Sequence, residues 1–81
     1  MRAEFGIHAR PASRIAQMAE SAHFAIWLAK DALRVDAADV LDILSLGALK
    51  GTEIIVEIEN REDMAILNRI VDFFETGFGE R

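Results

Sequence analysis

The sequence has 81 residues, of which 52% are hydrophobic and 28% charged, and this length and composition predict one folded domain over residues 1–81. Its formal net charge is −5, because 14 acidic residues outnumber 9 basic ones, and the basic residues are scattered along the chain. This charge pattern argues against nucleic acid and against an anionic membrane as partners.

Cysteine is absent, which excludes disulfides and thiolate metal sites. No apolar run approaches the ~20 residues that a membrane-spanning helix needs, and the start, MRAEFGIHAR, lacks the apolar segment of a secretory signal. We therefore expect a cytoplasmic protein. Because paired carboxylates, a nucleotide-binding loop and a cluster of metal ligands are also missing from the sequence, we expect neither a metal nor an organic cofactor.

The first predicted element is a helix over residues 9–22, with Pro11 in its first turn, where a missing N–H is harmless. Its apolar face would comprise Ala12, Ile15, Ala16, Met18, Ala19 and Ala22. Two alternating segments follow, FAIWLAK at residues 24–30 and LRVDA at residues 33–37, and they predict a β-hairpin. In the first segment Phe24, Ile26 and Leu28 share one face, and Ala25, Trp27 and Ala29 share the other.

A short helix is predicted over residues 40–44, with Asp39 as its N-cap and Gly47 just past its end. The segment EIIVEIE, residues 53–59, predicts a further strand. The last helix is predicted from Arg61 or Glu62 to about Glu75, ahead of two glycines, with an apolar stripe of Met64, Leu67, Ile70, Val71 and Phe74.

This order of elements favours an α+β fold, an open-faced β-sandwich whose antiparallel sheet is covered on one face by three helices. The other face would contact solvent, where polar residues are expected. Trp27 and Ile55 depart from that expectation, since the alternation places both on the open face.

The segment GIHARPAS, residues 6–13, places His8 at the start of the first helix. Backbone N–H groups without acceptors and the positive end of the helix dipole make such a position an anion site. Arg10 adds a guanidinium whose donors match phosphate oxygens, and a neutral imidazole is a good nucleophile near pH 7. These features describe a histidine that can accept, hold and release a phosphoryl group.

A solvated side chain without a role is the alternative interpretation of His8, and the residues alone leave both open. His23 serves as a comparison. It lies between the first helix and the first strand, with no cap position, arginine or proline beside it, so we assign it no role.

GIHARPAS together with the later LDILSLGALKGTEI, residues 41–54, resembles the HPr family of histidine-containing phosphocarrier proteins of the bacterial phosphotransferase system. The resemblance extends without a gap over residues 6–74. It implies that His8 is phosphorylated on Nδ1 and that Arg10 assists the transfer. It also implies that the protein is a carrier rather than a turnover enzyme. Such a carrier takes phosphate from phosphorylated enzyme I and passes it to an enzyme IIA, for sugar uptake or for a nitrogen-type regulatory branch.

Asp39 stands where the family has a second, regulatory phosphorylation site on serine. Aspartate is an equally good N-cap, so a purely structural interpretation is available. The functional interpretation is that an ATP-dependent HPr kinase cannot act here and that a permanent charge replaces a switchable one. Ser45 matches a position before the family's Leu-Gly turn, where a structural hydroxyl is ordinary.

The resemblance also implies a docking face around His8, made of an apolar patch of Val40, Leu41 and Leu44 with a rim that includes Arg14 and Gln17. Well-known members have basic residues around this rim, whereas this chain has Gln17, Glu20 and Asp42. We therefore expect weaker or redirected electrostatic steering toward acidic partners.

The family begins with a strand ahead of the histidine loop, and this chain offers only residues 1–5 for it. The N-terminal edge strand is therefore predicted to be shortened or missing, although a wrongly assigned start codon explains the short segment equally well. A bare sheet edge beside Trp27 and Ile55 predicts a weak homodimer through that face. The rival function is an HPr-like regulatory binding module that acts on a transcription factor or an enzyme.

Overall fold

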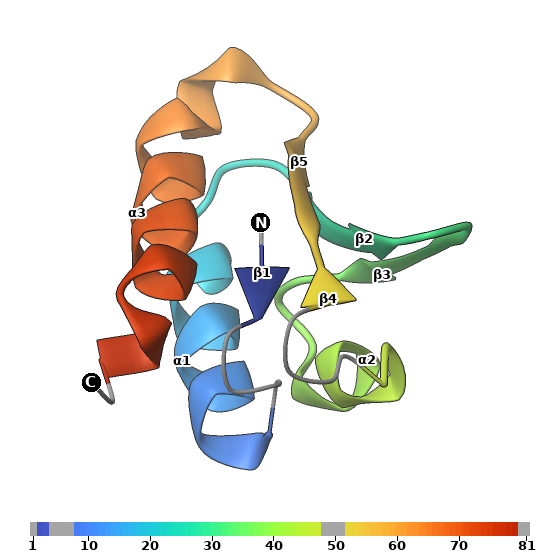
Figure 1. Cartoon of the computed structure of the whole chain (residues 1–81). Helices are drawn as coiled ribbons and strands as arrows, with labels where there is room; N and C mark the ends of the chain where they lie inside the picture. Colours follow the sequence, from blue (N-terminus) through green and yellow to red (C-terminus); the bar gives the residue numbers. More distant parts are fainter. Residues whose placement is uncertain (1, 4–7, 48–51, 80–81) are drawn as a thin grey trace.

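Three α-helices and an antiparallel sheet form the chain, as the computed structural model shows for residues 2–3, 8–47 and 52–79 (Figure 1). The α-helices are α1 (Ala9–Glu20), α2 (Val40–Ser45) and α3 (Met64–Glu75). The strands are β1 (Arg2–Ala3), β2 (Ile26–Lys30), β3 (Leu33–Asp36), β4 (Thr52–Glu53) and β5 (Ile55–Ile58). Two short 3₁₀ turns, η1 (Arg61–Asp63) and η2 (Gly77–Gly79), flank α3.

The sheet has the order β3-β2-β5, with antiparallel pairing throughout. Ile26 and Leu28 of β2 and Val35 of β3 are buried against the helices, while α1 and α3 lie side by side on that face (Figure 1). The α+β architecture with helices on one face of an antiparallel sheet is therefore confirmed. None of the helices in the described ranges is long and apolar enough to span a lipid bilayer.

Helix α1 buries the face that the sequence predicts, but it ends at Glu20 rather than at residue 22. The Ser21 hydroxyl donates to the Met18 carbonyl at 2.7 Å. Serine competes in this way for backbone partners at helix ends, which explains the earlier termination.

Strand β2 begins two residues later than predicted, at Ile26, and Phe24 is 45% exposed instead of facing the core. The cause is the Asp63 carboxylate, which is only 1% exposed and accepts hydrogen bonds from the backbone N–H groups of His23 and Phe24, both at 2.8 Å. These bonds take the two amides out of the strand ladder and fasten the α1–β2 connection to the start of α3.

The predicted strand over residues 53–59 is divided at Ile54, whose side chain is fully buried. Its first part, β4, pairs with β1, and its second part, β5, pairs with β2. An N-terminal strand is therefore present, with Arg2 opposite Glu53 and Ala3 opposite Thr52. The prediction of a missing strand is wrong, and that of a shortened one stays a prediction, since residues 1 and 4–7 lie outside the described ranges.

The last helix, α3, is preceded by the 3₁₀ turn η1. Its buried apolar face differs from the predicted apolar stripe at Met64, which is 46% exposed. Ile70 and Phe74 are fully buried as predicted. The chain then folds back beyond Gly77, and Phe78, at a φ of 61°, packs its ring 5.2 Å from the ring of Phe74 and is 5% exposed. Burial of Phe78 was not predicted, because this residue lies outside any periodic segment.

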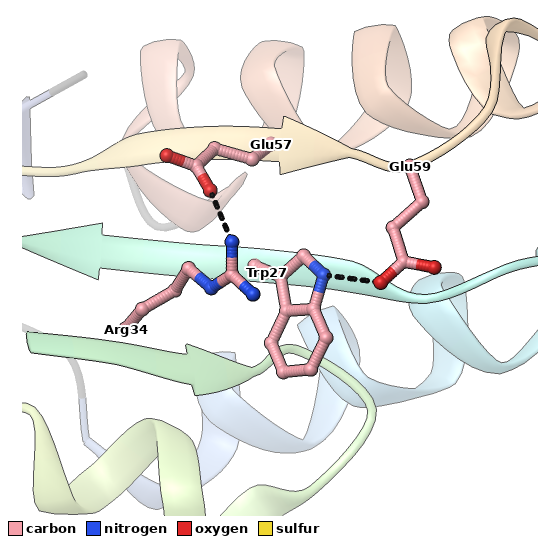
Figure 2. A network of polar contacts seen from close by, with 4 residues as sticks. All are labelled: Trp27, Arg34, Glu57 and Glu59. Atoms are coloured by element: carbon pink, nitrogen blue, oxygen red, sulfur yellow. Dashed lines mark hydrogen bonds and ion pairs between the residues drawn. The ribbon is translucent and has the colours of Figure 1, made fainter.

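The open face of the sheet is more polar than predicted (Figure 2). Trp27 is half-buried, and its indole Nε1 donates to Glu59 Oε2 at 3.1 Å. The guanidinium carbon of Arg34 lies 4.4 Å from the centroid of the Trp27 ring, and Arg34 Nη1 donates to Glu57 Oε1 at 3.4 Å. These side chains lie on the side of the sheet away from α1 and α3 (Figure 2).

The predicted patch of Trp27 beside Ile55 is therefore wrong in its geometry. Trp27 is directly opposite Glu57, whereas Ile55 is opposite Ala29, so the two apolar residues are only diagonal neighbours. Sequence alternation identified their shared face but not the strand register, which decides the pairing. Ile55 alone remains well exposed there, at 55%.

Replacing Asp63 with alanine should destabilise the fold by about 2 kcal/mol or more, because two amides would lose their buried acceptor. The change can be measured by urea unfolding, followed by the fluorescence of Trp27, the only tryptophan in the chain. Asp72, which is exposed on α3, offers a matched control: its replacement by alanine should change stability by less than about 0.5 kcal/mol. Equal effects of the two substitutions would contradict the anchoring role of Asp63.

Candidate functional site

His8 is the N-cap of α1, as the sequence predicts, with an extended backbone at φ −119° and ψ −175°. Its carbonyl accepts the first helical hydrogen bond, from the Ala12 N–H at 3.0 Å, while its side chain makes no capping bond to the helix. The residue is exposed. The imidazole is therefore presented to solvent at the positive end of a 12-residue helix.

The backbone around His8 favours an anion. The N–H groups of Ala9 and Arg10 have no acceptor within the helix, and Pro11 has no N–H to satisfy. The first turn of α1 contains no acidic residue that would compete for this end of the helix. A phosphate on His8 would therefore meet backbone donors and a favourable dipole, with no carboxylate in the first turn of α1 to repel it.

The core fixes this helix end in place. Pro11, Ala12 and Ile15 are buried directly below the exposed residues 8–10. Arg10 is exposed in the first turn, so the structure places it at the same helix end as His8, as predicted. Sequence order and helix geometry are enough to bring these two residues together.

Asp39 caps α2, and its Oδ1 accepts a hydrogen bond from the Asp42 N–H at 3.1 Å. The Ser45 hydroxyl donates to the Asp42 carbonyl at 2.6 Å, so the expected structural hydroxyl is confirmed. Gly47 follows the helix with a φ of 64°, a conformation that glycine adopts without strain. Aspartate at position 39 therefore provides the N-cap that α2 needs.

The predicted apolar patch on α2 is centred on Leu41, which is 76% exposed, whereas Val40 and Leu44 are half-buried and pack against the core. Helix α2 contacts α1. Gln17 is exposed on α1, and Arg14 is exposed with its guanidinium carbon 5.6 Å from the centroid of the Phe73 ring of α3. Arg14 of the predicted rim therefore packs against α3.

His23 lies outside this site. Its backbone N–H is bound to Asp63, and it lies beyond the opposite end of α1 from His8. Sequence reasoning missed Asp63, whose carboxylate acts through hydrogen bonds to a segment about 40 residues away. Among the described residues, no group of three or more His, Asp or Glu side chains is arranged to hold a metal ion.

Comparison with known proteins identifies the family. The model described as the PTS HPr component phosphorylation site matches residues 1–76. The chain belongs to the HPr family, the phosphocarrier proteins of the phosphotransferase system. Its relatives include the phosphocarrier protein HPr of Chlamydia pneumoniae, which is 37% identical over 75 residues, an alignment that covers 93% of this chain and 69% of that protein.

Solved HPr structures share the fold. HPr-C-His from Thermoanaerobacter tengcongensis superposes with a TM-score of 0.91 at 31% identity, over 100% of this chain and 93% of that one. An HPr dimer from the same organism gives a TM-score of 0.82 at 34% identity, over 91% and 85% of the two chains. The helix end at His8 is therefore part of an HPr fold.

Proposed function

We propose that this protein carries a phosphoryl group on His8, accepting it from phosphorylated enzyme I and passing it to an enzyme IIA component of a sugar-uptake or nitrogen-type regulatory branch. The observation that supports this most strongly is the exposed imidazole at the N-cap of α1 in a chain of the HPr family. The protein acts as a carrier and not as a turnover enzyme, and we place it in the cytoplasm.

The transfer requires little from the carrier itself. Nδ1 of the neutral imidazole attacks the phosphorus, and the bond between phosphorus and the donor atom of enzyme I breaks as the new N–P bond forms. The N–P bond breaks in turn when the acceptor on enzyme IIA attacks. Positioning and charge stabilisation dominate such reactions, and the amides at residues 9–10 and the Arg10 guanidinium supply both.

Partner docking would use the surface next to His8. Leu41, with Val40 and Leu44 beside it, offers an exposed apolar contact, and Gln17 adds a polar one. The central part of a protein interface is more apolar than its rim, which suits an exposed apolar side chain such as Leu41. Glu20 and Asp42 give this surface less positive charge than a basic rim would, so apolar contact rather than electrostatic steering should dominate affinity.

Asp39 removes one form of regulation from this scheme. A carboxylate cannot accept phosphate from a serine kinase, and it holds a constant negative charge at the start of α2. We propose that the chain is therefore not a substrate of an HPr kinase at this position.

His8→Ala should abolish phosphate acceptance while leaving the fold intact. The imidazole makes no capping hydrogen bond to α1, so its loss should cost no more than about 1 kcal/mol of stability. Incorporation of labelled phosphate from phosphoenolpyruvate through enzyme I gives the measurement. His23→Ala is the matched control and should accept phosphate normally, whereas normal acceptance by the His8 variant would refute the proposal.

Arg10→Ala should slow phosphoryl transfer by about tenfold to a hundredfold without preventing it, because the backbone donors at the helix N-terminus remain. Rapid-quench measurement of the transfer rate from enzyme I tests this. Arg61→Ala removes an equally exposed positive charge from η1 and should leave the rate within about twofold. An unchanged rate in the Arg10 variant would show that the arginine has no part in transfer.

Self-association through the open sheet face also stays a prediction, with Ile55 instead of Trp27 at its centre. Among the described residues β5 pairs with β2 only, and we expect its other edge to be available for a second chain. Repulsion between Glu57 and its symmetry mate would keep the dimer weak. Sedimentation at rising concentration should detect a homodimer that Ile55→Lys weakens, and a strict monomer at high concentration would rule it out.

A further inference from the structure

A cavity of about 350 Å³ opens between α1 and α3, away from the His8 end of the helix. Its lining comprises Arg14, Gln17, Met18 and Ser21 from the α1 side and Arg69 from α3. Arg14 lies six residues beyond His8, which corresponds to about 9 Å along a helix axis. All of the lining residues except Met18 are exposed, so the cavity is a hollow open to solvent.

The charge of this cavity is opposite to that of the whole protein. Two guanidinium groups from different helices line it, and in residues 8–47 and 52–79 neither of them forms an ion pair with a carboxylate. The chain as a whole has a net charge of −5. Two like charges that share a hollow repel each other, and an anion between them would convert this repulsion into attraction.

The donors of the cavity are partly preorganised. The guanidinium carbon of Arg14 lies 5.6 Å from the centroid of the Phe73 ring, and within the described ranges its N–H donors form no hydrogen bond, so they are available to a ligand. The side-chain amide of Gln17 makes no hydrogen bond within the described ranges, so its two N–H donors are also available.

Ser21 and Met18 provide no hydrogen-bond donor from their side chains to a ligand in the cavity. The Ser21 hydroxyl hydrogen is used in the bond to the Met18 carbonyl, so the serine cannot donate to a ligand without breaking it. The half-buried Met18 side chain adds an apolar wall. The cavity therefore combines cationic and amide donors at separate points with an apolar surface between them.

We propose that this cavity binds a small organic polyanion, a phosphorylated or multiply carboxylated metabolite with at least two anionic groups. One group is held by Arg14 and Gln17 and the other by Arg69, through the charge-assisted hydrogen bonds that guanidinium forms with phosphate and carboxylate oxygens. The site is separate from the phosphate position at His8, so its occupation does not depend on phosphoryl transfer.

Titration of the full-length, unphosphorylated protein with inorganic pyrophosphate, followed by the backbone amide signals in NMR, tests the proposal. The ionic strength is held constant near 0.15 M, where charges more than about 8 Å apart are largely screened. We expect saturable shifts at millimolar concentration for the amides of Arg14, Gln17, Ser21 and Arg69. Arg14→Gln and Arg69→Gln should each weaken the affinity by about tenfold or more.

Arg61→Gln is the matched control, because it removes the same charge from an exposed position outside the cavity. The affinity of this variant for pyrophosphate should stay within about twofold of the wild-type value. Equal weakening by all three substitutions would overturn the proposal in favour of general charge attraction. Shifts confined to the amides of Ala9 and Arg10, or the absence of saturable shifts, would overturn it as well. The amide spectra of the free variants establish that each remains folded.

Discussion

Burial of one face of α1 is the constraint on which the candidate site depends. Pro11, Ala12 and Ile15 are packed in the core, so the helix cannot rotate or slide without exposing them. This packing holds the N-terminal end of α1 at the surface, where His8 and Arg10 remain in contact with solvent. A reactive imidazole is thereby presented by a rigid helix, although the residue itself contributes nothing to the core.

Local signals in the sequence were sufficient for this part of the molecule. The N-cap at His8, the Asp39 cap and the core face of α1 all follow from helix periodicity and capping preferences, and each is found as predicted. Contacts between distant segments were not predictable in this way. Asp63 looks like an ordinary acidic residue at a helix start, yet its carboxylate binds two amides about 40 positions away in the chain and shortens β2. Phe78 enters the core only because the chain reverses after α3.

Three of the nine basic residues lie at the two surfaces where we propose that anions bind. The net charge is −5, but Arg10 lies at the helix end beside His8, and Arg14, one turn further along α1, shares a cavity with Arg69 of α3. On the open face of the sheet, by contrast, Arg34 is paired with Glu57 and lies over Trp27 (Figure 2). Paired arginines stabilise the fold modestly, whereas unpaired ones keep their donors for ligands. This distribution separates the structural from the candidate functional charges.

The central claim is that His8 accepts a phosphoryl group, and the chemistry of the modified wild-type protein tests it most directly. After incubation with enzyme I and phosphoenolpyruvate, the account predicts phosphate that is labile in acid and stable in base, as expected for phosphohistidine, and that maps to His8. Such a result would also separate a phosphocarrier from a binding module that merely shares the fold. No transferred phosphate, or phosphate stable in acid as on a serine, would contradict the account.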